Sequence, residues 1–457
     1  MLSFIEIIRR AETGPMTTEK DFGLMISRKT MELCKEYDIK YNPEEIIPSD
    51  NSLADDVWNA GLELFLHTGV YYSSTRRIIK FTEEEVKEAL KYFRENVEVG
   101  EGRDRIRFIH RQIEDKRPMI IGGGTSGTSI DPDMLIKLNQ AFAQEPWNDI
   151  MALPGRVEKA FGLMVRENSP LQIYFVRIFA ERLREVLENA GRPGMPTMIG
   201  IAAGVTGVAD LVADEYLRPH VDIRCLMVHP DLRVDDDQLS KAVHWKSRGF
   251  FIWSGGTPLV GSWCGGPEGT ALECIAFALA QLMVYKADLI YTGANHITYH
   301  AMTNPPTLWT TSVAVQALAR NTRANGGPVT RTFAGPGTEQ VYYELAAYTI
   351  VLNVSGSGAV IDPRMALPRY ANQVSPLETR LMAEVNEAVS GMKREDANEI
   401  VKAICAKYKD YMDIHKAPIG KTFEQLYDLE NLQPKEEALK VYEKAKKELE
   451  NLGLKFK

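Results

Sequence analysis

The chain has 457 residues, of which 25% are charged and 44% hydrophobic, and its formal net charge is -8. These proportions are ordinary for a globular protein, and the negative charge argues against nucleic-acid binding, which needs a basic face. The five cysteines show no CxxC spacing, so we expect reduced thiols and a cytoplasmic protein. The longest apolar stretch, near residues 271–285, contains Glu273 and Gln281, and we predict no membrane span.

Residues 1–115 are charged and are predicted to form a helical N-terminal region. Apolar residues recur at helical spacing over Thr18–Tyr37 and Asp50–His67. Thr82 followed by Glu85 predicts a capping box at the start of a helix over Glu83–Asn96. Between these helices, β-branched and aromatic residues over Tyr71–Phe81 indicate a small hairpin.

From residue 118 onward, short apolar runs alternate with longer helical patterns. The predicted strands are Pro118–Gly122, Asp149–Leu153, Thr197–Ala202, Ile223–Val228, Phe250–Ser254, Asp288–Tyr291, Val329–Phe333 and Gly358–Ile361. Continuous apolar strands alternating with amphipathic helices indicate a parallel sheet buried on both faces. Eight such units favour an α/β fold of the (β/α)8 TIM-barrel type over an open doubly wound sheet. Asp149–Leu153 is the weakest of these predictions, and an open sheet of six or seven strands would not need it.

We therefore expect a barrel over residues 116–395 and a helical C-terminal tail over residues 396–457 that packs on it. Within the tail, Lys435–Leu452 alternates Lys and Glu over a stripe of apolar residues. Such a pattern is typical of a surface helix or of a helix at an oligomer contact. The stripe comprises Ala438, Val441, Tyr442, Ala445 and Leu449.

In a barrel of this type the chemistry belongs to the loops that follow the strands. The first such loop is glycine-rich, Gly122–Gly127, and fits either an anion-binding backbone or a tight turn. It matches neither a phosphate-binding P-loop nor a dinucleotide fingerprint. Glu268 opens a helix after the fifth strand, where it either complements the helix dipole or holds a cation and acts in acid–base chemistry.

Further polar and aromatic residues follow the sixth and seventh strands. His296 lies just after a predicted strand, which favours function, but no His or Cys set has the spacing of metal ligands. Arg331 faces either the barrel interior or an ion pair. Aromatic residues near these loops fit a cage for a methylated ammonium, but more often belong to the core. These aromatic residues are Trp245, Trp253, Trp263, Tyr299 and Trp309.

An ordered series of segments resembles the monomethylamine:corrinoid protein methyltransferases of methylotrophic archaea over nearly the whole chain. The segments are Thr75–Thr82, Glu101–Asp104, Gly123–Gly127, Ala190–Met195, Gly265–Gly266 with Glu268, Gly293 with His296, Ala334–Pro336 with Thr338 and Glu339, Gly420–Phe423 through Tyr427–Asp428, and Leu449–Leu454. The resemblance implies a β/α barrel that moves a methyl group from a methylated amine to the Co(I) corrinoid of a separate corrinoid protein. It also implies a homo-oligomer that binds no cofactor tightly itself.

The chain departs from this family at the family's characteristic residue, pyrrolysine, whose aligned position is Met198. A family glutamate aligns with Cys225, and a glutamine and a tyrosine align with Val329 and Arg331, whereas the glutamate at Glu268 is kept. We therefore expect Met198, Cys225 and Val329 to line an altered substrate site.

Without pyrrolysine, a substrate that already carries a positive charge, such as a quaternary ammonium compound, offers another route, because its leaving group is a neutral amine. Glu268 and His296 are then expected to be the catalytic residues, with Glu268 holding the cation and His296 or Tyr299 contacting the rest of the substrate. Arg331 is expected to meet a carboxylate if the substrate is a betaine-like zwitterion.

Two alternatives stay open. One is a non-catalytic homologue that binds a corrinoid protein or a small ligand. A filled barrel mouth would favour this alternative, whereas convergence of Glu268, His296 and Arg331 on one open cavity would favour the enzyme. The other is an unrelated lyase or aldolase that forms a Schiff base, which is weak because no lysine lies at a predicted strand end.

Overall fold

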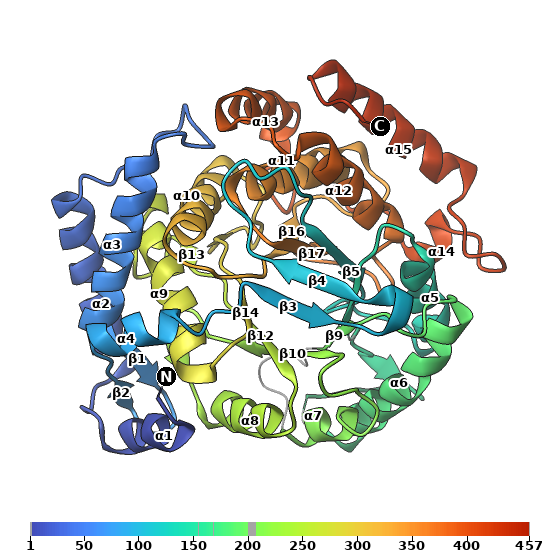
Figure 1. Cartoon of the computed structure of the whole chain (residues 1–457). Coiled ribbons are helices and arrows are strands. Elements are labelled where there is room, and N and C mark those ends of the chain that lie inside the picture. The colour runs from blue at the N-terminus through green and yellow to red at the C-terminus, as the bar shows by residue number, and fades with distance from the viewer. Residues whose placement is uncertain (1, 154, 168, 200–206, 457) are drawn as a thin grey trace.

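Eight parallel strands form a curled sheet with helices around it (Figure 1). The computed structural model describes residues 2–153, 155–167, 169–199 and 207–456. In sheet order the strands are β16 (Val329–Thr332), β17 (Ala359–Met365), β5 (Ile120–Gly124), β6 (Ile150–Leu153), β9 (Thr197–Ile199), β10 (Ile223–Met227), β12 (Phe251–Gly255) and β14 (Leu289–Ile290). All eight predicted strands are present. Residues 200–202 of the third prediction lie outside the described residues.

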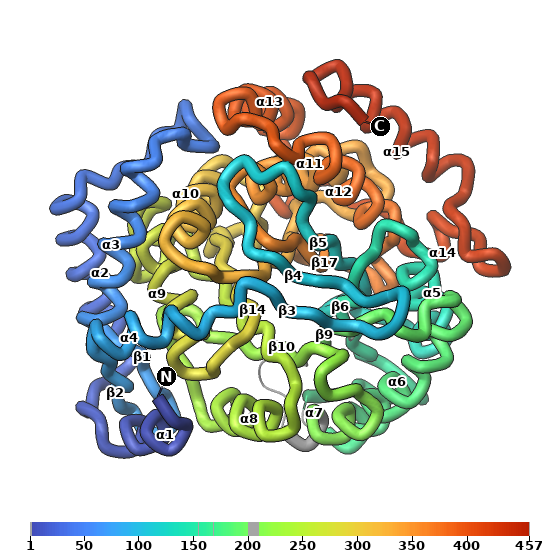
Figure 2. Tube along the Cα trace, viewed as in Figure 1, coloured from blue at the N-terminus to red at the C-terminus, as the bar shows by residue number. Residues whose placement is uncertain are grey.

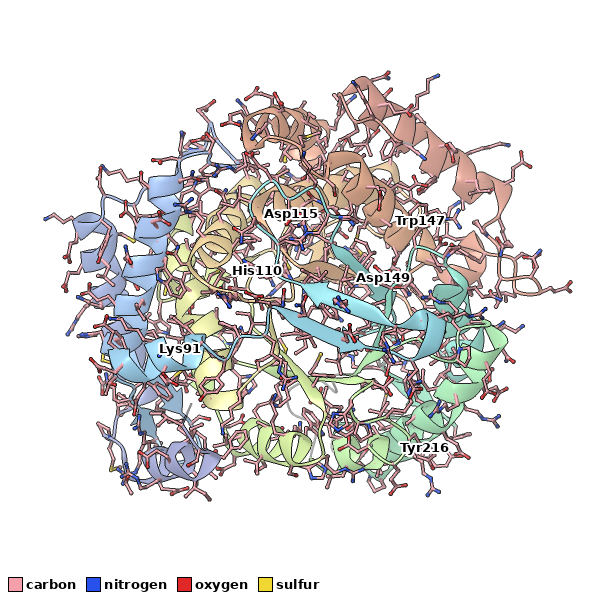
Figure 3. The ribbon with its side chains drawn as sticks, viewed as in Figure 1. Lys91, His110, Asp115, Trp147, Asp149 and Tyr216 are labelled. Carbon is pink, nitrogen blue, oxygen red and sulfur yellow. The ribbon has the colours of Figure 1, made fainter. Side chains whose placement is uncertain are left out.

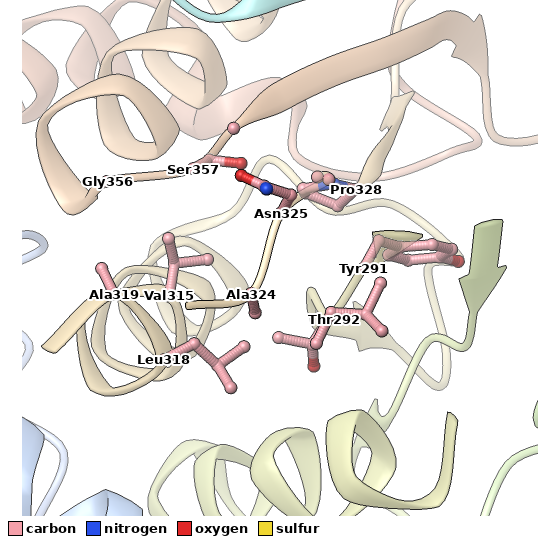
Figure 4. A pocket seen from close by; sticks show the side chains of 14 residues that line it. Tyr291, Thr292, Val315, Leu318, Ala319, Ala324, Asn325, Pro328, Gly356 and Ser357 are labelled. Atoms are coloured by element: carbon pink, nitrogen blue, oxygen red, sulfur yellow. The ribbon is translucent and has the colours of Figure 1, made fainter. Parts of the chain in front are cut away.

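The strand order is that of a barrel, because strands adjacent in sequence pair with each other and β17 pairs back to β5. Among the described residues, β14 and β16 share no ladder. Instead the Ile290 N–H donates to the Asn325 carbonyl over 2.8 Å. A small cavity of about 30 Å³ lies at this seam between Tyr291, Asn325 and Pro328 (Figure 4). The curled sheet is therefore bridged here by the segment before β16.

One helix follows each of the eight strands and covers the outside of the sheet. They are α5 (Leu135–Gln144), α6 (Pro170–Asn189), α7 (Gly207–Ala213), α8 (Asp236–Ser247), α9 (Pro267–Tyr285), α10 (Pro305–Asn321), α11 (Glu339–Ser355) and α12 (Pro376–Val389). By length and composition α9 would be able to cross a membrane, but 94% of that stretch is buried inside the fold. The reason is a second layer of helices, which covers α9 and α11 from outside.

The N-terminal part of that second layer flanks α9 and α10, on the blue side of Figure 2. Its elements are α1 (Phe4–Thr13), α2 (Glu19–Glu36), α3 (Asn51–Thr68), β1 (Val70–Tyr72), β2 (Arg77–Ile79) and α4 (Glu83–Leu90). The predicted hairpin is confirmed, since β1 and β2 pair antiparallel. The predicted capping box of Thr82 and Glu85 is also confirmed.

A second hairpin, β3 (Asn96–Val99) and β4 (Ile106–Ile109), was not predicted, because residues 1–115 were expected to be helical apart from the hairpin at Tyr71–Phe81. Val97, Val99 and Phe108 are buried and pack with residues from inside the barrel. The ring of Phe108 meets that of Trp253 edge to face at 5.3 Å. The hairpin crosses the centre of the view in Figures 1 and 3, where His110 follows β4. It closes the amino end of the barrel.

The C-terminal tail also contains the predicted helix and packs on the barrel helices. Its elements are α13 (Arg394–Tyr408), α14 (Phe423–Leu426) and α15 (Glu436–Asn451). Ala438, Tyr442, Ala445 and Leu449 are buried, and α15 lies against α11. The rings of Tyr342 and Tyr442 meet at 5.4 Å. The apolar stripe of α15 is therefore buried against other parts of the same chain.

Candidate functional site

A cavity of about 330 Å³ lies at the carboxyl ends of the barrel strands. Its walls come from β9, β10, β12, β16 and β17 and from the residues that follow β6 and β14. The lining residues include Met198, Cys225, Met227, Trp253, Gly255, Tyr291, Val329, Arg331, Ile361, Asp362 and Arg364. The barrel mouth is therefore open at the place where barrel enzymes carry their chemistry.

The structure brings together four of the predicted site residues. Met198, Cys225, Val329 and Arg331 come from three strands, β9, β10 and β16, and all line the cavity. Burial raises the pKa of the Cys225 thiol to about 12, so this side chain is a neutral thiol at neutral pH. Three other predicted residues, Glu268, His296 and Tyr299, are not among the residues that line this cavity.

Glu268 lies in the first turn of α9, one residue after Pro267. Its carboxylate folds back over Gly266, where an added Cβ would lie 2.8 Å from Oε1. Together with burial, the negative charge of Glu268 raises the pKa of Cys34, on the outer helix α2. The helix-dipole role that the sequence left open for Glu268 therefore fits its position.

His296 and Tyr299 lie in the loop that follows β14. There β15 (Asn295–His296) pairs with β13 (Leu259–Val260) beyond the barrel strands. The rings of His296 and Tyr299 stack at 4.5 Å, and Tyr299 meets Phe333 at 5.8 Å. Burial lowers the pKa of His296, which favours the neutral imidazole. These rings pack with each other and with Phe333.

Asp362 is a functional candidate that the sequence did not reveal. Val329 pairs with Ile361 and Thr330 with Pro363, so Asp362 is the extra residue of a bulge in β17. Its φ of 57° is left-handed, a conformation that a residue without special support rarely adopts. Its side chain is buried, and neither carboxylate oxygen has a hydrogen-bond partner among the described residues. The bulge places in the cavity wall a buried carboxylate that accepts no hydrogen bond from a described residue.

The last predicted strand ended at Ile361, one residue too early to include this carboxylate. The usable signal was an Asp–Pro pair directly after that strand, since Pro363 lacks an N–H and interrupts the ladder.

Arg331 and Arg364 lie side by side on neighbouring strands, as register partners of β16 and β17. The Arg364 Nη1 donates to the carbonyl of Ser126, and its Nε lies 3.4 Å from an Asp362 oxygen. The Arg331 side chain forms no hydrogen bond or ion pair with any residue that the structure describes. Burial and the charge of Arg364 lower the pKa of Arg331 to about 10, so Arg331 stays charged at neutral pH.

Two glycines make room for side chains of the site. A Cβ at Gly127 would overlap the Arg364 guanidinium, and a Cβ at Gly255 would overlap the ring of Tyr291. The glycine-rich loop over Gly122–Gly127 was expected to be either an anion-binding backbone or a tight turn. The tight turn is confirmed, since the Thr128 N–H donates to the Thr125 carbonyl over 3.0 Å. Its glycine, Gly127, also makes room for a cationic side chain that lines the cavity.

Trp253 and Tyr291 supply the aromatic part of the cavity wall. The Trp253 Nε1 and the Tyr291 hydroxyl are buried and have no hydrogen-bond partner among the described residues. Burial raises the pKa of Tyr291 to about 12, so its hydroxyl is a neutral donor. Of the five aromatic residues singled out in the sequence, only Trp253 lines this cavity. Trp245 instead lies 4.3 Å below Arg224, and Trp309 packs against Tyr41 at 5.4 Å.

The model of one protein family matches residues 2–454, the family described as monomethylamine methyltransferase MtmB. Monomethylamine methyltransferase MtmB1 of Methanosarcina acetivorans is 29% identical, over 98% of this chain and 97% of that protein. Monomethylamine methyltransferase MtmB of Methanosarcina mazei is 28% identical over the same shares. Two crystal structures are similar at a TM-score of 0.93 and 27% identity, over 99% of this chain and 98% of theirs. They are Methanosarcina barkeri MtmB and a hydroxylamine complex of MtmB.

Proposed function

Because the chain belongs to the monomethylamine methyltransferase MtmB family, we propose that it moves a methyl group from a methylated amine to the Co(I) corrinoid of a separate corrinoid protein. The observation that carries this proposal is the buried carboxylate of Asp362 in the open cavity, whose oxygens accept no hydrogen bond from a described residue and whose ion pair with Arg364 is long, at 3.4 Å. A buried carboxylate whose oxygens lack hydrogen bonds is costly, and a cation that binds against it lowers that cost. A cationic amine would bind in this way.

The surroundings of Asp362 support a methylated ammonium. Trp253 and Tyr291 line the same cavity, and aromatic faces attract ammonium groups by about 0.5–2 kcal/mol. Met198 and Met227 add polarizable apolar surface for methyl groups. We propose that these side chains take the roles that the sequence assigned to Glu268, His296 and Tyr299.

The chemistry favours a quaternary donor and needs no pyrrolysine. The N–CH₃ bond breaks with its electron pair remaining on nitrogen, which leaves as a neutral tertiary amine. The electron pair of Co(I) forms the new bond to carbon, and no proton has to move. The protein then contributes position and charge complementarity, with Met198 at the place of the family's characteristic residue.

The corrinoid protein is expected to bind at the mouth of the cavity. A corrinoid ring is much larger than a cavity of about 330 Å³, so the donor binds inside and the acceptor approaches from outside. Arg156 and the exposed Glu167 form part of the rim that such a partner would meet. Assembly into a homo-oligomer stays a prediction.

Methyl transfer from purified chain to a purified Co(I) corrinoid protein tests this proposal. Monomethylamine, tetramethylammonium, choline and glycine betaine are offered in parallel, and the loss of Co(I) absorbance is followed. We expect demethylation of a quaternary compound and little of monomethylamine. Demethylation of monomethylamine alone would overturn the quaternary donor. Binding of these compounds without any transfer would favour the non-catalytic homologue. The Schiff-base alternative gains no support, since no lysine is among the described residues that line the cavity.

A further inference from the structure

We propose that the methyl donor carries a carboxylate, so that the substrate is a zwitterion such as an N-methylated amino acid or betaine. Its anionic end would lie on Arg331 and Arg364, and its ammonium on Asp362 with Trp253 and Tyr291. This inference rests on the proposed methyl transfer and specifies its substrate class.

The charges inside the cavity carry the argument. Arg331 and Arg364 are directly opposite each other on adjacent strands, a placement that disfavours like charges. Asp362 is the buried acid beside them, and its Oδ2 lies 3.4 Å from the Arg364 Nε. Two guanidinium groups thus face one carboxylate, so this part of the cavity wall carries one positive charge in excess. A carboxylate on the ligand would balance it.

The hydrogen-bonding capacity of the two arginines points the same way. The Arg331 Nε is buried without a partner, although a guanidinium has five N–H donors to satisfy. Arg364 is fixed by its bond to the Ser126 carbonyl, which leaves its remaining N–H groups near the cavity. A planar guanidinium binds a carboxylate through two parallel hydrogen bonds, a geometry that a hydroxyl or a methyl group does not match.

The position of Arg331 and Arg364 also orients the ligand. A second cavity of about 450 Å³ adjoins the first and shares Gly127, Arg156, Arg331 and Arg364 with it. Arg369 lines only this outer cavity. Of these two cavities, only the inner one is lined by Trp253, Tyr291 and Asp362. The anionic end of a substrate would therefore point outward, and its methylated ammonium inward.

Calorimetric titration of the full chain with glycine betaine, choline and tetramethylammonium tests the inference. All three carry a quaternary ammonium, and only glycine betaine carries a carboxylate. We expect glycine betaine to bind the wild-type chain at least about 10-fold more tightly than choline. Arg331→Gln should remove this preference, because the affinity for glycine betaine falls whereas the affinity for choline does not. Arg331→Lys should keep part of it, because charge remains but the paired hydrogen bonds are lost.

Arg369→Gln is the matched control, since Arg369 lines only the outer cavity and the preference should survive. Thermal melting of each variant shows whether it is folded. Equal affinity of the wild-type chain for betaine and choline would overturn the inference. So would a betaine affinity that Arg331→Gln leaves unchanged, or arginine-dependent binding of inorganic phosphate without any preference for betaine.

The inference and the proposed function fail in different ways. Arginine-dependent betaine binding without methyl transfer to the corrinoid protein would uphold the carboxylate site and overturn the transfer reaction. Methyl transfer from choline or tetramethylammonium as fast as from glycine betaine, unaffected by Arg331→Gln, would uphold the reaction and overturn the carboxylate site.

Discussion

The guanidinium of Arg364 occupies the space that a side chain at Gly127 would need. Gly127 also has a φ of +66°, which side chains disfavour. Replacing Gly127 with Ala should therefore strain the backbone by about 1–2 kcal/mol and displace Arg364 from the cavity. We expect the affinity for glycine betaine, measured by calorimetry, to fall at least about 10-fold.

Gly102→Ala separates the two effects. Gly102 has a similar φ of +56°, but no atom lies within 4 Å of the Cβ that Ala would add. It lies in the turn of the β3–β4 hairpin, at the other end of the barrel. This variant should lose a similar amount of stability and keep its betaine affinity. Equal losses of affinity in both variants would show that backbone strain alone is responsible.

Asp362→Asn should remove the charge that holds the ammonium. The amide keeps the shape of the carboxylate, so the bulge of β17 should persist while the attraction for the cation is lost. Losing one partner of a buried charge pair costs about 2–5 kcal/mol, which predicts a fall in tetramethylammonium affinity of roughly 30-fold or more. Asp149→Asn is the control, because Asp149 accepts a bond from the Ile121 N–H at the amino ends of β5 and β6.

The same site predicts a pH dependence. Burial raises the pKa of Asp362 above its usual range, and the two arginines counteract this shift. Only the ionised carboxylate attracts an ammonium, so affinity should be lost as pH falls through the raised pKa. The wild-type chain should lose tetramethylammonium affinity on acidification, and Asp362→Asn should show a flat profile. A pH profile that is the same in both would remove Asp362 from the cation site.

Phe108→Ala tests the contact between the β3–β4 hairpin and Trp253 in the cavity wall. Phe108 is fully buried, and its ring supports that of Trp253 from the amino end of the barrel. Truncating a buried Phe typically costs about 3–5 kcal/mol. We expect a lower urea midpoint and a lower affinity for tetramethylammonium. Phe108→Leu should recover most of the stability. If it recovers the affinity equally well, apolar volume suffices and the ring contact is not required.

The sequence predicted the barrel strands well because each combines a buried apolar run with a following helix. The family resemblance placed Met198, Cys225, Val329 and Arg331 at one site, and all four line the same cavity. The helical prediction for residues 1–115 missed the β3–β4 hairpin. There the alternation of Val97 and Val99 reflects burial against the barrel interior, a partner that is distant in sequence.

Other differences between sequence and structure have a similar cause. Glu268 and His296 follow strands as functional residues do, but the turn of each loop directs their side chains to other neighbours. Asp362 was missed because a bulge changes the face on which a residue lies, and the alternation of side chains along a strand does not reveal a bulge.

Glu273→Gln tests a buried acid outside the cavity. Burial raises the pKa of Glu273 to about 8, whereas the unfolded chain loses this proton near pH 4.5. Between these values unfolding releases a proton, so the free energy of unfolding should fall as pH rises from about 4.5 to 8. The variant should melt at a higher temperature than wild type at pH 8.5, and the difference should shrink toward pH 5. A difference that does not vary with pH would contradict this prediction.

Glu344→Gln is the contrasting variant. Burial also raises the pKa of Glu344, to about 7, but its carboxylate accepts bonds from the N–H groups of Phe333 and Ala334, over 2.7 and 3.0 Å. An amide nitrogen cannot accept such a bond. Glu344→Gln should therefore lower the free energy of unfolding by about 1–3 kcal/mol. The melting temperature should accordingly be lower than that of wild type at both pH 5 and pH 8.5.

We predict that the corrinoid protein docks on the hairpin of β7 (Lys159–Ala160) and β8 (Leu163–Met164). It rises between Arg156 and Glu167, which line the cavity, and Phe161, Leu163 and Met164 on it are exposed by 59% or more. A partner that receives the methyl group must cover this rim, and exposed apolar side chains are a common feature of protein interfaces. Phe161→Ser combined with Leu163→Ser should raise the KM for the corrinoid protein about 10-fold and leave betaine affinity unchanged. Met31→Ser, an equally exposed apolar position on α2, should change neither quantity. If the hairpin variant keeps the wild-type KM, the corrinoid protein docks elsewhere on the rim.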